Sequence, residues 1–331
     1  MLNALETPAI RTRDLSKTFR AVRAVDDVNL EVPAGGVFGL LGPNGAGKTT
    51  IIRILATLAR PDSGQAQVFG HDVVDAPDAV RRNIALVGQF ASLDKALTGW
   101  ENLVLNARMQ GLPRREAKRQ AADVLDRLGL TEVARRPIRT YSGGMLRRLD
   151  IATSVLLAPP LLFLDEPTTG LDPHSRSQVW DIVRTLVERG TTVVLTTQYL
   201  EEADQLADRI AVLDRGTIIA DDTPARLKAS TGTGVLQIRV SDPAQRAPAR
   251  HILADRLGVA VDPESDPTTL SARIGTAATD PTAGGLVRDA VACLTDAGIG
   301  VAAFGLGQPS LDEVFLALTG HSANDISGDD T

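Results

Sequence analysis

The sequence of 331 residues is poor in the features of secreted and membrane-spanning proteins. Its single cysteine, Cys293, excludes an internal disulfide and a metal site built from several cysteines, and it fits a reducing compartment. The most apolar stretch, residues 152–164, is shorter than the roughly 20 residues of a spanning helix, and Pro159 and Pro160 interrupt it. The first residues, MLNALETPAI, have no basic segment followed by an apolar one, so we expect no signal peptide. We therefore predict a chain that is soluble on its own and meets a membrane only through a partner.

Positive charge is also scarce. The chain has 35 Lys and Arg residues against 41 Asp and Glu residues, a net charge of −6. Proteins that bind nucleic acid normally have a basic surface, so this charge balance argues against a nucleic-acid partner. The hydrophobic share of 43% and the charged share of 23% are those of an ordinary globular protein. The length allows two domains.

What the sequence does contain is a phosphate-binding loop. An apolar run, Val37–Leu41, precedes GPNGAGKT, and the helical pattern IIRILATL follows. Glycines let backbone N–H groups turn inward as an anion cradle, and the start of the following helix adds partial positive charge. We expect Lys48 to reach the β- and γ-phosphates of ATP and the Thr49 hydroxyl to ligate Mg²⁺. A chance glycine-rich turn is the alternative, and the flanking strand and helix argue against it. The predicted ATP-binding residues here are Gly42, Pro43, Asn44, Gly45, Ala46, Gly47, Lys48, Thr49 and Thr50.

Two acidic residues close another apolar run, in LLFLDEP at 161–167. This pattern predicts a buried parallel strand that ends in carboxylates, at the edge of the sheet where ligands bind. We expect Asp165 to hold Mg²⁺ and Glu166 to accept a proton from the attacking water as the catalytic base. The alternative is a pair of residues that cap a following helix.

A second glycine-rich helix start lies in TYSGGMLRRLDIA, residues 140–152. Such a start is a second anion site. One chain cannot easily wrap both sites around one phosphate. We therefore predict a head-to-tail homodimer, in which Ser142 and Gly144, with Gly143 between them, cap the γ-phosphate that the other copy binds.

The order of these motifs over about residues 8–225 resembles that of the ATP-binding subunit of an ABC transporter. GPNGAGKT resembles Walker A and LLFLDEP resembles Walker B. YSGGM resembles the signature LSGGQ, from which Tyr141 and Met145 depart, and GLDP at 170–173 resembles the D-loop. The resemblance implies an α/β fold, a P-loop NTPase nucleotide-binding domain of the ABC type. It also implies a helical subdomain at about 94–158 that carries the signature and faces a separate membrane permease.

The resemblance also implies roles for single residues. Gln89 matches the Q-loop glutamine, which in the family senses Mg²⁺ and contacts the transmembrane partner. Asp172 would lie at the dimer seam, next to ATP. Phe19 lies where the family stacks an aromatic ring on adenine, and the alternative is a core residue of an N-terminal strand.

One position departs from the family. In TTQYLEEAD the family normally carries a histidine where this chain has Gln198. Glutamine keeps an N–H donor but cannot carry positive charge or a proton. We interpret Gln198 as a neutral catalytic sensor of the γ-phosphate, and we expect active but modest ATP hydrolysis.

The same stretch, TTQYLEEADQLADRIAVLD, together with LDEVFLALTG, resembles the daunorubicin/doxorubicin resistance ATP-binding proteins of actinobacteria. In that family the ATP-binding subunit energises a separate permease that exports the antibiotic, and the drug binds mainly the permease. The resemblance implies a peripheral protein at the cytoplasmic face of the cell membrane. Another natural product, a lipid or a peptide remains open as the exported substrate.

A soluble ABC-type ATPase that acts on nucleic acid or ribosomes is a second function class. Such proteins usually carry two nucleotide domains or a long coiled-coil insert together with basic patches. This chain has one such domain, no heptad run and an acidic balance, which argue against that class.

We predict a nucleotide-binding domain at 1–230, an accessory or regulatory domain at 231–320, and a disordered tail at 321–331. The accessory domain carries a β-α-β-α-β pattern of the ferredoxin-like kind, in an α+β arrangement, and a last helix that Ser310 caps. His251 and Cys293 fall on helical patterns there, and we expect them to pack rather than react.

Local signals predict further elements. Alternation in residues 8–32 predicts a small antiparallel sheet, and RIAVLDRGTIIAD predicts a hairpin that turns at Asp214–Gly216. Thr98 and Glu101 form a capping-box pattern, and Pro113 suits the first position of a helix.

Overall fold

The computed structural model describes residues 7–89, 92–230, 234–264, 266–274, 283–307 and 310–319. The chain divides into two compact units, Met1–Thr223 and Pro224–Thr331. The sequence placed the boundary at 230/231, whereas here the helix α8 (Pro224–Ser230) belongs to the second unit, since it packs against α11 (Leu311–Thr319). The tail that we expected to be disordered, 321–331, lies outside the described residues.

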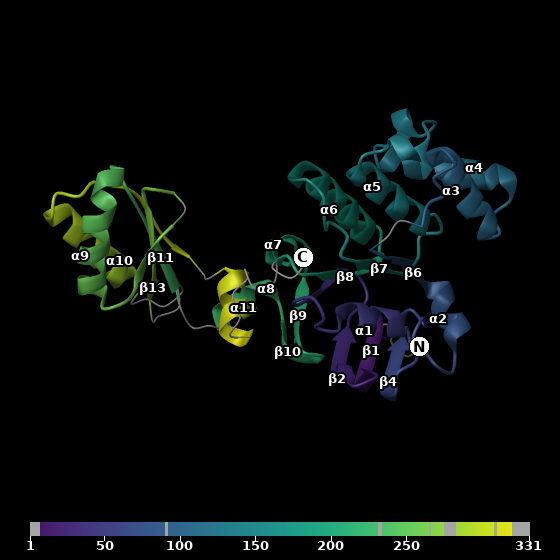
Figure 1. Ribbon diagram of the computed structural model, residues 1–331, viewed down its shortest axis with the longest axis horizontal. Coiled ribbons are helices and arrows are strands. Elements are labelled where there is room, and N and C mark those ends of the chain that lie inside the picture. The colour runs from purple at the N-terminus through teal and green to yellow at the C-terminus, as the bar shows by residue number, and fades with distance from the viewer. Residues whose placement is uncertain are drawn as a thin grey trace, which may run out of the picture. The chain divides into compact units, whose positions relative to one another are not determined.

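The first unit is built on a six-stranded sheet with the strand order β10-β9-β3-β8-β7-β6 (Figure 1). All neighbouring strands are parallel except β10 and β9. Every residue of β3, β7 and β8 is buried, which is typical of parallel strands covered on both faces. The strands are β3 (Val37–Leu41), β6 (Ile84–Val87), β7 (Leu161–Asp165), β8 (Thr192–Thr197), β9 (Arg209–Asp214) and β10 (Thr217–Asp222). The predicted parallel strands and the predicted hairpin are confirmed.

The hairpin turns where it was expected because two successive residues adopt left-handed backbone. Arg215 has φ 47° and Gly216 has φ 85°. Two such residues form the tight turn that matches the twist of antiparallel strands.

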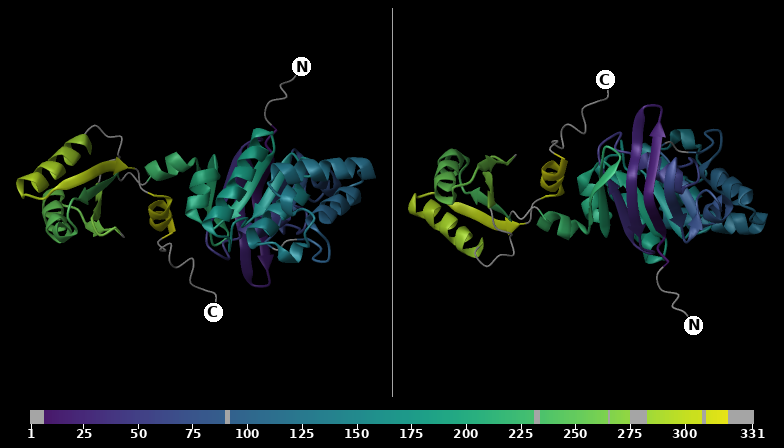
Figure 2. Two further views of the ribbon diagram at one scale, coloured as in Figure 1. Left: turned by 90° about the horizontal axis from the view of Figure 1, so that it is seen from above. Right: turned by 90° about the horizontal axis from the view of Figure 1, so that it is seen from below.

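A second, antiparallel sheet has the order β2-β1-β4-β5, which confirms the small sheet expected for residues 8–32. Its strands are β1 (Ile10–Phe19), β2 (Val22–Val32), β4 (Ser63–Val68) and β5 (His71–Asp72). In Figure 2 its long strands, coloured purple, stand beside the larger sheet of the same unit.

The helix α1 (Lys48–Leu55) lies between the two sheets and joins their cores. Its Ile51, Ile52 and Ile54 are at most 1% exposed and pack in one cluster with residues of β1, β2, β3 and β7. Burying each such side chain stabilises the fold by roughly 1.5–3 kcal/mol. The start of α1, which follows the phosphate loop, is thereby fixed in place.

The stretch predicted to be helical, 94–158, contains α3 (Gly99–Met109), α4 (Arg114–Arg127) and α5 (Gly143–Ser154), with short 3₁₀ turns at Thr131–Val133 and Ile138–Thr140. The capping box is confirmed: Thr98 Oγ1 accepts from Glu101 N at 3.2 Å, and Glu101 Oε2 accepts from Thr98 N at 2.8 Å. The placement of Pro113 was wrong by one residue. Its ψ of 148° is extended, so it is the flanking cap of α4 and not its first helical residue.

The described part of the first unit also contains α2 (Pro77–Asn83), α6 (Pro173–Glu188) and α7 (Leu200–Leu206). The helix α6 packs against both α5 and β8, so it connects the helical part to the sheet. Among the residues that the structure describes, no helix is long and apolar enough to cross a membrane.

The second unit carries its own antiparallel sheet, with the order β12-β13-β11-β14, and α9 and α10 pack side by side on it (Figure 1). The chain runs β-α-β-β-α-β, the ferredoxin-like split arrangement, so the sequence pattern had missed one strand, the three-residue β12. The elements are β11 (Gly234–Val240), α9 (Arg246–Leu257), β12 (Val261–Pro263), β13 (Thr269–Ile274), α10 (Ala283–Asp296) and β14 (Val301–Gly307), with a 3₁₀ turn at Pro243–Gln245.

Local expectations for this unit have mixed outcomes. Ser310 caps α11 as predicted, because its Oγ accepts from Glu313 N at 3.2 Å and Glu313 Oε2 accepts from Ser310 N at 2.9 Å. Cys293 packs against the core of the unit as expected. His251 does not pack, since it lies exposed on α9.

Candidate functional site

The phosphate loop joins β3 to α1 at the carboxyl end of the parallel strands. Gly45 and Gly47 have φ of 80° and 103°, a left-handed backbone that glycine adopts without strain. A side chain on Gly47 would collide with the carbonyl oxygen of Ala24, whereas Gly45 has no atom within 4 Å of such a position. Asn44 and Gly45 are exposed. The loop is therefore packed from behind and open in front, as an anion cradle must be.

The hairpin turn supports the loop from behind. Gly216 N donates to Ala46 O at 3.0 Å, and Asp26 N donates to Gly216 O at 2.8 Å. A side chain on Gly42 would collide with the carbonyl oxygen of Leu213. Strands β2 and β9 thus fix the path of the loop.

Lys48 is buried at the floor of the cradle, with an exposed fraction of 4%. Its Nζ donates to Gly42 O at 2.7 Å and to Pro43 O at 3.0 Å, and lies 3.8 Å from Glu166 Oε1. Burial lowers the pKa of Lys48, while the charges of Glu166 and Asp165 act in the opposite direction. The ammonium group is held mainly by loop carbonyls, which phosphate oxygens can replace.

Asp165 and Thr49, predicted to share Mg²⁺, do lie together. Asp165 Oδ1 accepts from Thr49 Oγ1 at 3.1 Å and from Thr196 Oγ1 at 2.6 Å, so it joins the ends of α1, β7 and β8. A carboxylate and a hydroxyl are the hard oxygen ligands that Mg²⁺ accepts. No group of three or more His, Cys, Asp or Glu suited to a metal occurs in the described residues. The donor set therefore fits an ion that takes its remaining ligands from water and substrate phosphates, the usual situation of protein-bound Mg²⁺.

Glu166 follows β7 in a left-handed conformation, with φ 47°. Its backbone N donates to Thr196 Oγ1 at 3.0 Å, and its Oε2 accepts from Thr169 Oγ1 at 3.3 Å. Strained backbone of this kind is concentrated at functional sites. The alternative that the two acids cap a helix is wrong, because the next helix begins only at Pro173, with Asp172 as its cap.

Gln198 comes directly after β8, on the strand next to the one that carries Asp165. Its Oε1 is buried and has no hydrogen-bond partner. A buried amide without a partner costs free energy and requires an explanation. A ligand in the cradle would supply one, since a half-turn of the amide exchanges its acceptor for an N–H donor.

The signature segment begins α5. Ser142 is its cap and accepts from Met145 N at 3.3 Å, and Ser142 and Gly143 are exposed. Gly144 is buried, and a Cβ there would lie 2.6 Å from Ser175 Cβ. Only glycine therefore allows α5 to approach α6 this closely.

Ser175 in turn is bound by Asp172. Asp172 Oδ1 accepts from Ser175 N at 2.9 Å, and Asp172 Oδ2 accepts from Ser175 Oγ at 2.6 Å. These bonds lower the pKa of Asp172. Asp172 itself is exposed. The signature glycine and the D-loop aspartate are thus joined through one serine.

Two further predicted residues, Gln89 and Phe19, also lie on the surface. Gln89, two residues after β6, is exposed. Phe19, the last residue of β1, is 50% exposed, so the alternative that it belongs to the core is wrong. Lys17 Nζ lies 5.4 Å from the centre of its ring. An exposed ring of this kind is free to stack on another aromatic group.

Sequence reasoning missed Arg147, which is buried on α5. Its Nε donates to Pro167 O at 2.8 Å, one terminal nitrogen to Gly88 O at 2.6 Å, and the other to Asp165 O at 3.1 Å. It also lies 3.7 Å from Asp150 Oδ2. Burial lowers the pKa of Arg147, and Asp150 opposes this. This arginine ties the signature helix to the strand end that carries the acids and to the residue before Gln89. The available signal was the pair of opposite charges, Arg147 and Asp150, at a spacing of three residues on one helix face.

Glu202 on α7 was also missed. It is 1% exposed, and its Oε1 accepts from Thr168 Oγ1 at 2.9 Å and from Trp180 Nε1 at 3.2 Å. Burial raises the pKa of this carboxyl group. The residue links the helix after Gln198 to the segment between Glu166 and α6.

Comparison with known proteins gives a consistent result. Residues 25–169 match the ABC transporter family. The chain is 57% identical over 326 residues to the daunorubicin/doxorubicin resistance ATP-binding protein DrrA of Streptomyces peucetius, which covers 98% of this chain and 97% of that protein. It is 44% identical over 300 residues to the doxorubicin resistance ATP-binding protein DrrA of Mycobacterium tuberculosis, which covers 89% and 88%.

Among solved structures, the dimeric post-hydrolysis state of an ATP-binding cassette bound to ADP and phosphate is similar to this chain. The TM-score is 0.59 at 26% identity, over 65% of this chain and 98% of that one. The fold of the first unit is thus that of ABC-type ATPase domains.

Proposed function

The chain belongs to the ABC transporter family, among the ATP-binding proteins of daunorubicin/doxorubicin resistance, and from this premise we propose that it drives the export of a hydrophobic drug through a separate membrane permease. As a member of this family it binds and hydrolyses ATP. The observation that carries the proposal is the meeting of the phosphate loop, Asp165, Glu166 and Gln198 at one edge of the six-stranded sheet.

Binding of ATP would use the open cradle. Backbone N–H groups of the loop, which is fixed from behind, would donate to phosphate oxygens, and Lys48 would exchange its carbonyl partners for β- and γ-phosphate oxygens. Phe19 would stack on adenine, which its exposed ring permits. Thr50 would contribute from the first turn of α1.

Thr49 and Asp165 would hold Mg²⁺, with Gln89 as the residue that senses it. When bound, the ion would neutralise part of the phosphate charge. The short contact between Thr49 and Asp165 supports this assignment, because it brings both donors to one point.

Glu166 would accept the proton of the attacking water. Its carboxylate is almost buried, at 9% exposure, and has Lys48 and Thr169 beside it, which hold it in one place. A positioned base contributes on the order of 10²–10⁴ in rate. Gln198 would donate to the γ-phosphate as a neutral group, which gives its orphaned amide a partner.

The site would be completed by a second copy of the chain. Ser142 and Gly143 are exposed at the start of the helix that they open. A head-to-tail dimer would place this start on the γ-phosphate of the other copy, with Asp172 at the seam. Closure on ATP and release on ADP would then move the permease, since only ATP contacts both halves.

The proposal also gives the chain a cellular location and a class of transported substrate. The chain would act at the cytoplasmic face of the cell membrane as a peripheral subunit. The drug would bind mainly the permease, and no nucleic acid would take part. Its 57% identity over nearly the full length to a drug-resistance protein supports an anthracycline-like drug.

The test is daunorubicin accumulation in cells that express the chain with its co-purifying membrane protein. We expect wild type to lower cell-associated drug fluorescence, and Glu166→Gln to abolish this effect because ATP turnover falls by about 10²-fold or more. Glu188→Gln, the same change at an exposed position near the end of α6, is the matched control and should behave as wild type.

Two different outcomes would refute two different parts of the proposal. Equal accumulation in wild type and Glu166→Gln, while the purified wild-type complex hydrolyses ATP, would refute the drug assignment and leave the energy-coupling role. Equal ATP turnover in wild type and Glu166→Gln would refute the role of Glu166.

A further inference from the structure

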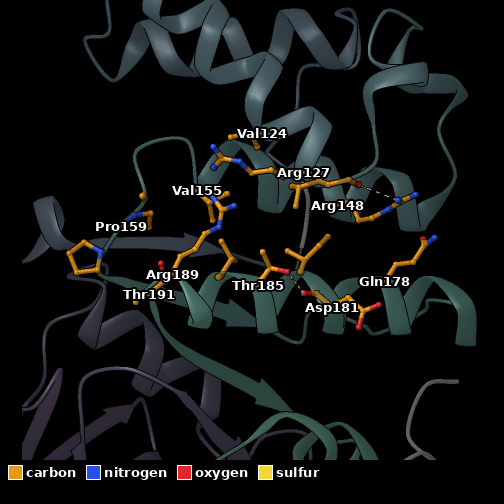
Figure 3. A pocket seen from close by; sticks show the side chains of 16 residues that line it. Val124, Arg127, Arg148, Val155, Pro159, Gln178, Asp181, Thr185, Arg189 and Thr191 are labelled. Carbon is orange, nitrogen blue, oxygen red and sulfur yellow. Dashed lines mark hydrogen bonds between the residues drawn. The ribbon is translucent and has the colours of Figure 1, made fainter.

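A cavity of about 490 Å³ lies in the first unit, away from the phosphate loop (Figure 3). Its walls come from α4, α5 and α6 and from the residues just before β7 and β8, including Pro160 and Thr191. These are the amino ends of the strands whose other ends carry Asp165 and Gln198. The cavity therefore lies about one strand length, roughly 17–20 Å, from the ATP site.

Most of the wall is apolar, and the size suits a small molecule. Val124, Leu128, Val155, Pro159, Ile182 and Leu186 line the cavity. Pockets for small molecules typically measure roughly 300–1,000 Å³ and combine such a wall with a few polar groups that fix orientation.

The charged groups here are mainly guanidinium groups. Arg127, Arg148 and Arg189 line the cavity, and Asp181 is the one carboxylate in the lining. Asp181 already pairs with Arg184 at 2.9 Å. In the described parts of the chain no carboxylate lies within ion-pair distance of the three lining arginines. The lining thus has three guanidinium groups without a paired carboxylate, of which Arg148 is partly buried and Arg127 and Arg189 are exposed.

The three arginine side chains lie at different ends of the cavity. In Figure 3 the Arg127 and Arg189 side chains reach toward the same region beside Val155, and Arg148 extends toward Gln178. Arg148 Nε is buried and has no acceptor, and its one recorded bond, to Leu128 O, is long at 3.4 Å. Burial lowers the pKa of Arg148, which means that the surroundings disfavour its charged form. No carboxylate of the described chain lies close enough to offset this cost.

Favourable interaction with helix C-termini explains the positions of only two of the three arginines. Arg127 is the last residue of α4 and Arg189 caps α6, and cations are favourable at helix C-termini. Arg148 lies in the middle of α5, where no such dipole end is available to it. A buried donor without an acceptor needs another partner.

We propose that this cavity binds a small amphipathic anion, with an apolar body against the helix side chains and a carboxylate or phosphate head on the arginines. Such heads accept paired hydrogen bonds from a guanidinium group, which are stronger than bonds between neutral groups. A cation of the same shape is excluded, because it would meet three like charges.

The test is fluorescence titration of the full-length chain with anilinonaphthalene sulfonate, an amphipathic anion that brightens in apolar sites. We expect saturable binding that decanoate or decyl phosphate displaces and that decyltrimethylammonium does not. The two anions distinguish a carboxylate from a phosphate head.

Variants locate the site. We expect Arg148→Gln and Arg189→Gln each to weaken binding about tenfold or more, since each removes a charged donor. Thr185→Trp, which fills the cavity without changing its charge, should abolish binding. Arg115→Gln removes a charge from an exposed position of α4 outside the cavity and is the matched control, which should bind as wild type does.

Binding that Thr185→Trp and both arginine variants leave unchanged would overturn the proposal. Displacement by decyltrimethylammonium as readily as by decanoate would also overturn it. Thermal melting with and without ATP, measured for every variant, separates loss of binding from loss of folding.

Discussion

Gln198 stands where the resemblance to the family implies a histidine, and it separates two accounts of hydrolysis. A histidine at this place could take a proton, whereas a glutamine can only donate or accept a hydrogen bond. Glu166 lies 3.8 Å from Lys48 at the same strand edge, and Glu166 and Asp165 are the carboxylates whose charges act on this lysine. Proton transfer should therefore rest on Glu166.

We expect the wild-type chain to hydrolyse ATP well above Glu166→Gln, and Gln198→Ala to reduce turnover on the order of 10²-fold through loss of one γ-phosphate donor. Gln198→His should stay active but acquire a pH dependence near the ordinary histidine pKa of about 6.5. Phosphate release from the purified complex between pH 5.5 and 8.5 measures both. Wild-type turnover no higher than that of Glu166→Gln would contradict this account.

Glu202 makes stability depend on pH in a definite direction. Burial raises the pKa of its carboxyl group, so the unfolded chain releases this proton at lower pH than the folded chain does. The stability that the protonated group contributes is complete below the unfolded pKa and is lost as pH rises through the folded pKa.

We expect Glu202→Gln, which mimics the protonated group, to melt above wild type at pH 8 and to lose that advantage as the pH falls toward 4.5. Melting temperatures by scanning fluorimetry from pH 4 to 9 test this. Glu201→Gln is the control, because Glu201 is exposed on the same helix and its pair with Arg176 should contribute little. An advantage that is equal at every pH would show that ionisation of Glu202 is not its cause.

At the scale of elements, α5 and α6 meet through Gly144 and Ser175. A Cβ on Gly144 would displace Ser175, whose backbone and hydroxyl are the partners of Asp172. A change in the signature helix is thereby transmitted to the cap of α6.

We expect Gly144→Ala to destabilise the first unit by about 1–3 kcal/mol through overpacking. In a Ser175→Gly background the same change should cost less, since the clashing atoms are gone. Chemical denaturation of the four chains of this double-mutant cycle measures the coupling. Equal costs in both backgrounds would show that the contact with Ser175 is not responsible.

Elements with a strong local signal were predictable from the sequence, and elements set by tertiary contact were not. The Thr98 capping box and the turn at Arg215 and Gly216 rest on neighbours in sequence, and both are confirmed. The strand β12 has three residues, Val261–Pro263, too few to show a period, and it exists because β13 pairs with it. Pro113 fitted two adjacent helix positions, and only its extended ψ decided between them.

The site residues also differ in whether a local sequence pattern predicts them. The cradle, Asp165 and Glu166 each lie inside a contiguous motif. Arg147 reaches three carbonyls that are 18, 20 and 59 residues away in sequence, and no local pattern encodes such a set.

At the scale of the whole molecule, each unit has a core of its own. The cluster around α1 contains residues of the first unit, and the cluster on β11–β14 contains residues of the second. Separate cores of this kind allow separate folding.

We expect residues 1–223 to fold alone and to bind ATP, with a melting temperature that rises with ATP concentration as mass action requires. Scanning calorimetry of this fragment and of the full chain measures it, and the full chain should show a second transition. An insoluble fragment, or one that ATP does not stabilise, would show that the first unit depends on the second.

The lone cysteine lies in the second unit, on α10, with its thiol bonded to Ala290 O at 3.1 Å. Burial raises the pKa of Cys293, so little reactive thiolate is present near neutral pH. A maleimide dye should then label the folded chain more slowly than the unfolded chain. Because the 331 residues contain no second thiol, this labelling rate would monitor the second unit alone while the first unit turns over ATP.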